Sequence, residues 1–347
     1  MFLTETARRF PSLTPRFFAG KRSPPASKNL ERVSQSFDEN LLRRLKTLNP
    51  PSINLSWISL AVDFLCYIHT EAENLVSDLK LSGSENSLAS YLDESVKLLD
   101  LCNSIVMEIE RLRQGRLLIV SGIQRFQRCQ NQNLAPEELC RVRDSLSDWG
   151  NRSFVHTNRR LQSPGELIRD LARGLGSSPS GKIKTVGDVV KRMIYTVGAM
   201  TVLVAGVMVS ALTESTETIQ VRVPAEFSWS DAFNGLASAV SVEIERRFKD
   251  ASDRRRFVDD VDDVEKRVRS VCDVINNVVG GGVGEGKERL ESGFKELEEM
   301  TVTLTERLDR FSDGVNGFFR TVLSTRNSLL GKFRVGSEMR LEQKGKM

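Results

Sequence analysis

One glycine-rich segment contains the residue types of a nucleotide-binding loop. Gly281, Gly286 and Lys287 fit the pattern G-x-x-x-x-G-K, in which backbone amides and the lysine bind phosphate groups. The next residue is Glu288, where such a loop needs the hydroxyl of serine or threonine to hold magnesium. The loop must also follow a β-strand, whereas the residues before it have a helical pattern. We therefore expect no nucleotide binding at this segment.

Residue types that catalyse reactions or bind metals are scarce and scattered. The histidines are His69 and His156, whereas a zinc site needs histidine and cysteine at ligand spacing. The five cysteines are far apart and form no C-x-x-C motif: Cys66, Cys102, Cys129, Cys140 and Cys272. Such spacing within helical patterns is typical of reduced, buried thiols. We predict no catalytic, cofactor-binding or metal-binding residue, and therefore a protein that is not an enzyme.

The charge distribution argues against nucleic acid as a partner. The formal net charge is +4. Arg254–Arg256 is a basic run, but nine Lys or Arg and nine Asp or Glu lie between Glu243 and Arg269. Nucleic-acid binding would require an unbalanced basic stripe. The glycosylation sequons at Asn54 and Asn151 are expected to be unused, because no apolar run typical of a secretory signal follows Met1.

The longest uncharged stretch of the chain is Met193 to Leu212. Its 20 residues lie between Arg192 and Glu214, and about 20 apolar residues suffice for a helix to cross a bilayer. We predict a membrane span here. Lys182, Lys184, Lys191 and Arg192 would then place the N-terminal half in the cytosol. The alternative is a helix buried on all sides in a soluble bundle, which the Gly, Ala and Thr content also allows.

The elements around this stretch have helical periodicity. Two runs of apolar residues repeat every three or four positions, from Phe257 to Val278 and from Leu290 to Phe311. The glycines of 280–286 separate the two runs, which predicts an antiparallel helical hairpin. The N-terminal half has further helical runs, of which the longest extends from Leu88 towards Phe126. Few prolines and abundant Leu, Glu, Arg and Ser agree with an all-α chain.

Several of these helical segments resemble the plant BYPASS family. They are LSWISLAVDFLCYIHTEAENLVSDLKL (55–81), YLDESVKLLDLCNSIVMEIERLRQGRLLI (91–119) and FFRTVLSTRNSLLGKFR (318–334), and the phrase VKLLDLCN (96–103) carries the resemblance most firmly. The resemblance covers residues 35 to 335. It implies a role in plant root and shoot development, in which a root-derived mobile signal is restrained. It supplies no catalytic residue, because these segments are helical packing motifs.

These observations predict an all-α, elongated multi-helix bundle with a central apolar helix and a C-terminal heptad hairpin. The expected regions are a disordered basic tail or organelle transit peptide (1–33), an N-terminal helical region (34–176), a linker (177–192), the apolar helix (193–212), a connection (213–228), the hairpin region (229–335) and a disordered tail (336–347). We expect a membrane-associated regulator or scaffold that binds protein partners through helical surfaces, with no small-molecule substrate evident. The alternative is a soluble helical adaptor in membrane trafficking or signalling, located in the cytoplasm, or in the plastid if the tail is a transit peptide.

Overall fold

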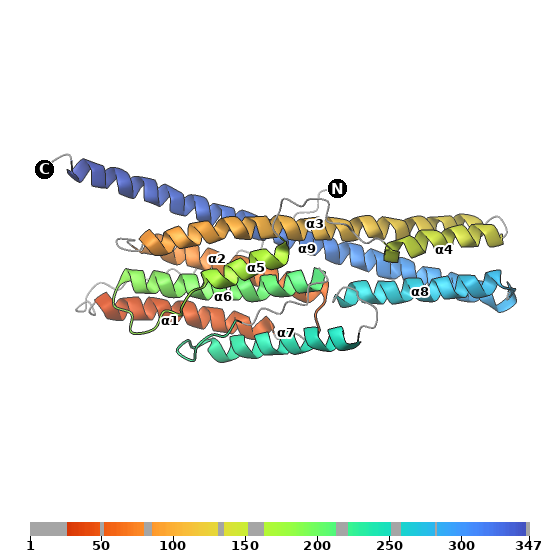
Figure 1. The fold of residues 1–347 in the computed structure, drawn as a ribbon, viewed down its shortest axis with the longest axis horizontal. Coiled ribbons are helices and arrows are strands. Elements are labelled where there is room, and N and C mark those ends of the chain that lie inside the picture. The colour runs from red at the N-terminus through yellow and green to blue at the C-terminus, as the bar shows by residue number, and fades with distance from the viewer. Residues whose placement is uncertain are drawn as a thin grey trace, which may run out of the picture.

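The protein is an elongated bundle of α-helices (Figure 1). The computed structural model describes residues 26–48, 52–79, 85–130, 135–151, 163–212, 221–250, 258–281 and 283–344. Within these residues there is no β-strand, and the predicted all-α fold is confirmed. The helices are α1 (Ala26–Leu45), α2 (Leu55–Asp78), α3 (Glu85–Gln130), α4 (Pro136–Asn151), α5 (Pro164–Gly174), α6 (Val186–Leu212), α7 (Ser230–Asp250), α8 (Asp259–Val279) and α9 (Val283–Lys344), with a 3-10 turn at Lys46–Leu48.

The two longest helices, α3 and α9, extend along most of the molecule (Figure 1). With 62 residues, α9 is about 90 Å long at 1.5 Å per residue. Its buried positions repeat every four and three residues without a break: 290, 294, 297, 301, 304, 308, 311, 315, 318, 322, 325 and 329. The predicted seam ended at Phe311, so the structure extends it by five positions. The helices that pack against α9 therefore contact one continuous apolar seam.

Pairwise contacts fix the direction in which the neighbours of α9 run. Helix α2 runs parallel to it, because Glu73 contacts Thr325 and Val62 lies against Gly314, with the same offset in sequence. Helix α3 runs antiparallel to it, because Arg113 pairs with Asp309 while Ser95 contacts Arg326. The predicted antiparallel hairpin is formed by α8 and the start of α9.

Two parts of the bundle lie on either side of its middle (Figure 1). We call α4, α8 and the segments 113–130 and 283–307 of the long helices the distal arm. We call α1, α2, α5, α6, α7 and the segments 85–112 and 308–330 the body. Since α3 and α9 belong to both parts, the predicted N-terminal region (34–176) and hairpin region (229–335) are not separate units in space. They share both long helices.

Three predicted boundaries differ from the structure. Helix α6 begins at Val186, within the predicted linker 177–192, because Thr185 accepts a hydrogen bond from Asp188 N and Asp188 accepts one from Thr185 N. Helix α1 begins at Ala26, within the predicted tail 1–33, and residues 1–25 lie outside the described part. Helix α9 continues to Lys344, into the predicted tail 336–347, since no proline or capping signal ends it earlier.

Two glycines allow α4 to pack closely against α3. A Cβ atom at Gly115 would lie 2.7 Å from a Trp149 ring carbon, and one at Gly122 would lie 2.8 Å from Leu146 Cδ2. The sequence alone marks both glycines as weak points of a long helix. The structure instead places each under a large buried side chain of the neighbouring helix.

We predict that Gly115→Ala destabilises the protein by about 1–3 kcal/mol, because the new methyl group forces Trp149 out of its position. The matched control is Gly317→Ala in α9, where a Cβ atom meets no atom within 4 Å. That change should stabilise the helix by about 0.5–1 kcal/mol. Urea unfolding of both variants measures the difference. Equal effects of the two substitutions would contradict the close packing of α4.

Candidate functional site

The predicted apolar stretch forms most of α6, and this helix lies inside the body. Among the described residues, α6 is the one helix long and apolar enough to cross a membrane, with a mean hydropathy of 1.9 in its most apolar window. In the fold, 83% of that window is buried. Helices α2, α3 and α5 pack along it, and α1 and α7 cover it more sparsely. Ala199, Met200 and Ala205 have no exposed surface.

A buried ion pair fixes the start of α6 to α1 and α7. The Arg192 guanidinium donates to Asp38 Oδ2 at 3.0 Å, and Trp229 Nε1 donates to Asp38 Oδ1 at 3.3 Å. The same guanidinium lies 4.1 Å from the centre of the Phe227 ring. Burial raises the pKa of the Asp38 carboxyl, and the charge and hydrogen bonds of Arg192 oppose that shift. Arg192, predicted to flank a membrane span, is thus committed to contacts inside the protein.

A chain of polar side chains crosses the body at His69, which is 1% exposed. The Thr201 hydroxyl donates to the carbonyl of Val197 and therefore accepts from His69 Nε2, 3.0 Å away. The other ring nitrogen, Nδ1, accepts from the Tyr91 hydroxyl at 3.3 Å. On the α9 side, Tyr91 and Thr325 line the same cavity, and the Thr325 hydroxyl lies 3.0 Å from Glu73 Oε2. Residues of α2, α3, α6 and α9 are joined in this way.

Burial keeps His69 neutral. It lowers the pKa of the imidazole to about 3, since no carboxylate compensates for the lost hydration. The Phe318 ring packs edge-on against the imidazole with 5.0 Å between ring centres. A histidine that is uncharged, enclosed and hydrogen-bonded at both nitrogens is suited to fixing the packing of four helices. The sequence gives no sign of this role, because Thr201 is 132 residues away.

Two small cavities flank Tyr91. The first, about 20 Å³, lies between α2, α3, α5 and α6 and is lined in part by His69, Glu94, Ser95 and Leu171. The second, about 10 Å³, lies towards α9 and includes Glu73 and Thr325 in its lining. Tyr91 and Val197 line both. Each has room for about one water molecule.

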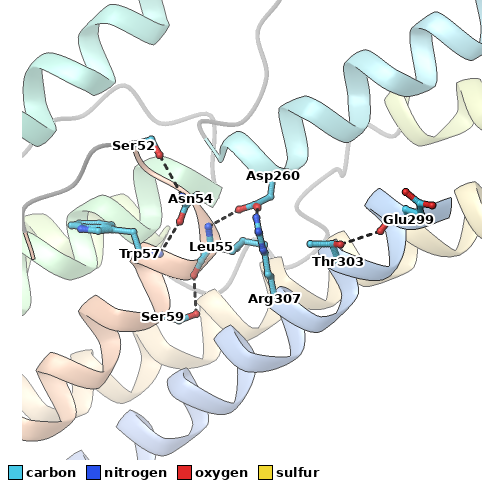
Figure 2. Close-up of polar contacts among 9 residues, drawn as sticks. All are labelled: Ser52, Asn54, Leu55, Trp57, Ser59, Asp260, Glu299, Thr303 and Arg307. Atoms are coloured by element: carbon cyan, nitrogen blue, oxygen red, sulfur yellow. Dashed lines mark hydrogen bonds and ion pairs between the residues drawn. The ribbon is translucent and has the colours of Figure 1, made fainter. Parts of the chain in front are cut away.

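The distal arm is joined to the body by a second polar junction (Figure 2). Asp260 in the first turn of α8 accepts a hydrogen bond of 2.7 Å from Leu55 N at the start of α2, and it pairs with Arg307 of α9. The backbone adds a link from Asp259 N to the carbonyl of Ile53. The Asp260 side chain is 5% exposed. The start of α2 and the hairpin of α8 and α9, which are distant in sequence, therefore meet at one carboxylate.

The other residues that the sequence analysis considered either cap a helix or form a turn, or they lie outside the described residues. Asn54 of the first sequon caps α2 by accepting from Trp57 N, so its amide is already engaged in the fold. Gly280 and Gly281 turn the chain between two helices, so no strand precedes Lys287. His156, Arg254–Arg256 and the serine of the sequon at Asn151 lie outside the described part. Of the predicted connection (213–228), the structure describes residues 221–228, and these residues form no strand.

The cysteines are all free thiols. Burial raises the pKa of Cys66 to about 11 and that of Cys102 to about 12, which disfavours the reactive thiolate. Among the described residues, no group of three or more His, Cys, Asp or Glu side chains is placed to hold a metal ion.

Sequence comparisons place the chain among plant proteins. Residues 163–332 match the family described as Protein ROH1-like. UPF0496 protein 4 of Oryza sativa subsp. japonica is 34% identical over 234 residues, which are 65% of this chain and 51% of that protein. Protein BPS1, chloroplastic, of Arabidopsis thaliana is 27% identical over 324 residues, 91% of this chain and 87% of that protein. Protein ROH1D of Arabidopsis thaliana is 20% identical, with 87% and 88% covered.

The fold and these relatives define the class of the protein. It is an elongated all-α bundle built on two long helices, and no solved structure matches it. The chain spans about half the length of the rice relatives and most of the length of BPS1. These matches support a BYPASS-related plant protein, in agreement with the motifs of its second, third and last helices.

The neutral state of His69 predicts a pH-dependent stability. Because its pKa is lowered by folding, its contribution is complete above the unfolded value of about 6.5 and is lost as the pH falls towards 3. Below pH 6, the wild type should lose about 1.4 kcal/mol per pH unit relative to His69→Gln. Urea unfolding between pH 7 and pH 5 measures this difference. Parallel stability profiles of the two proteins would show that His69 is not held neutral.

The junction at Asp260 predicts a large local effect. Asp260→Ala should cost about 2–4 kcal/mol, because it leaves Leu55 N without an acceptor and Arg307 without its partner. The control is Asp263→Ala in the same helix, where the carboxylate pairs with Lys266 and both side chains are well exposed. That change should stay within about 0.5 kcal/mol of the wild type. Thermal and urea unfolding compare the two variants, and similar costs would contradict the assignment.

Proposed function

We propose that the chain is a non-enzymatic scaffold in plant development, and that it acts through helical surfaces with α6 as the core of its body. The burial of α6 carries this proposal. A helix that spans a membrane exposes its apolar side chains to lipid, whereas here those side chains contact α2, α3 and α5. Insertion would also break the pair between Arg192 and Asp38.

The developmental role rests on kinship. A relationship to BPS1 over 91% of the chain supports a role in plant development. We propose, as the family resemblance implies, that this role concerns root and shoot growth and the restraint of a root-derived mobile signal. The word chloroplastic in the relative's name supports the plastid as a location, and the basic, acid-poor residues 1–33 have the composition of a transit peptide.

The scaffold proposal also rests on the shape of the molecule. Helices α3 and α9 present long solvated faces whose charges form pairs along and between the helices, such as Arg113 with Glu110 and Asp309. Long helices of this kind offer extended surfaces for partner helices. The polar groups inside the body are used to fix helix packing, as at His69.

Membrane association is the second candidate, and the length and hydropathy of α6 favour it. In that case Lys182, Lys184 and Lys191 would keep the N-terminal half in the cytosol. In the scaffold, α1 and α7 stay packed on α6. In a membrane protein, they would have to move away from α6 so that lipid can contact it.

Fractionation of a tagged full-length chain tests the proposal. We expect alkaline carbonate to release the protein from membranes, as it releases a peripheral marker protein, because α6 is held inside the bundle. Protease added outside sealed microsomes should remove epitopes placed before residue 180 and after residue 230 alike. Retention in the carbonate pellet together with an integral marker, with the second epitope protected, would overturn the proposal in favour of a spanning α6.

A further inference from the structure

The cavity between α3, α5 and α6 has an electrostatic character that the packing of helices does not require. We propose that it is a binding site for a small organic cation, a protonated amine on a compact apolar body, with Glu94 as the residue that binds the ammonium group. The scaffold function proposed above does not depend on this site.

The first observation is the state of Glu94. Its carboxylate is half-buried in the cavity wall, and its hydrogen bond to Ser90 Oγ is long, at 3.5 Å. Among the described residues, no Lys or Arg side chain forms an ion pair with it, although the charge of nearby Lys97 favours its ionised form. Burial raises the pKa of Glu94, so the carboxylate is short of stabilising contacts. A half-buried carboxylate with so few contacts favours a cationic partner.

The second observation is the end of α5, which faces the same carboxylate. A Cβ atom at Gly174 would lie 2.5 Å from Glu94 Oε1, so the last residue of α5 is in direct contact with it. The carbonyl end of a helix carries partial negative charge. Arg173, which precedes Gly174 in the chain, is paired with Asp170. Two sources of negative potential therefore converge at one side of the cavity, which selects for positive charge.

The rest of the cavity lining indicates that the body of the ligand, apart from its ammonium group, is apolar. Beyond Glu94 the walls are mainly apolar and come from Leu98, Leu171, Ile194 and Val202. His69 is neutral there, with both ring nitrogens already hydrogen-bonded, so it adds no competing charge. A site with one carboxylate and apolar walls suits an aryl or alkyl ammonium ion and disfavours an anion.

The cover of the cavity is the part that must move. With about 20 Å³ of free space the cavity admits a water molecule, and a ring needs more room. Leu175, the residue after α5, packs against Gly198 of the cavity wall, where a Cβ atom would lie 2.5 Å from Leu175 Cδ2. The next residue, Gly176, has a φ of 58°, which glycine adopts readily. Helix α5 is short, at 11 residues, and can act as the lid.

Benzylamine, which is protonated at neutral pH, is the probe that tests this site. Calorimetry on the purified full-length chain should give saturable binding, and amide NMR shifts should centre on Glu94, Leu171 and Gly198. Glu94→Gln keeps the shape of the side chain and should weaken binding about tenfold or more, because the charge-assisted hydrogen bond is lost. Benzyl alcohol has the same shape without the charge, and it should bind the wild type as weakly as benzylamine binds Glu94→Gln.

The matched control variant is Asp93→Asn, which removes the adjacent but exposed carboxylate and should leave benzylamine binding unchanged. Thermal unfolding of both variants shows that each is folded before its affinity is compared. Three results would each overturn the proposal: no saturable binding at millimolar benzylamine, equal affinity of the wild type and Glu94→Gln, or equal loss in both variants. Shifts that centre away from Glu94 would do the same.

Discussion

The body of this protein is arranged around the need to keep α6 out of water. Its last 20 residues carry no charge, and exposing that much apolar surface would cost far more than a domain's net stability. Helices from before and after it in sequence close over it, so that Ala199 and Ala205 are completely covered. Small residues matter here because they let several neighbours approach one helix. Two polar residues of α6, Arg192 and Thr201, bind partners inside the protein, which are Asp38 and His69.

The continuous seam of α9 allows one helix to belong to both the distal arm and the body. Its four-three spacing presents the same kind of apolar stripe to α8 in the distal arm and to α2 in the body. The polar members of the seam, Thr301 and Thr325, return a hydrogen bond to the preceding turn. They interrupt the apolar stripe without leaving a buried hydroxyl unsatisfied. The arm and the body are thereby held on a common axis, with Asp260 fixing the point where they meet.

Much of this fold is readable in the sequence, because periodicity is a local property. The helices around Val261 to Val278 and Leu290 to Phe311 are where the spacing predicts them. In α3 most positions of the apolar repeat are buried, but Val96 is 44% exposed while the neighbouring Ser95 is buried. A pattern of apolar residues does not predict that a serine is buried, and the partner of Ser95, Arg326, is 231 residues away. The cavity at Glu94 is unpredictable for the same reason, since its walls come from four helices.

The parallel pairing of α2 with α9, at an offset of 252 residues, has a consequence for how the protein is made. The surface of α2 that receives Phe318 and Thr325 is synthesised long before these two residues of α9. At about 5–20 residues per second, the interval after α6 emerges is roughly ten seconds. During that time the nascent chain presents an uncharged helix without its finished surroundings. Helix α7, which covers part of α6, is synthesised after it, so the complete cover of α6 forms only after α6 itself has been translated.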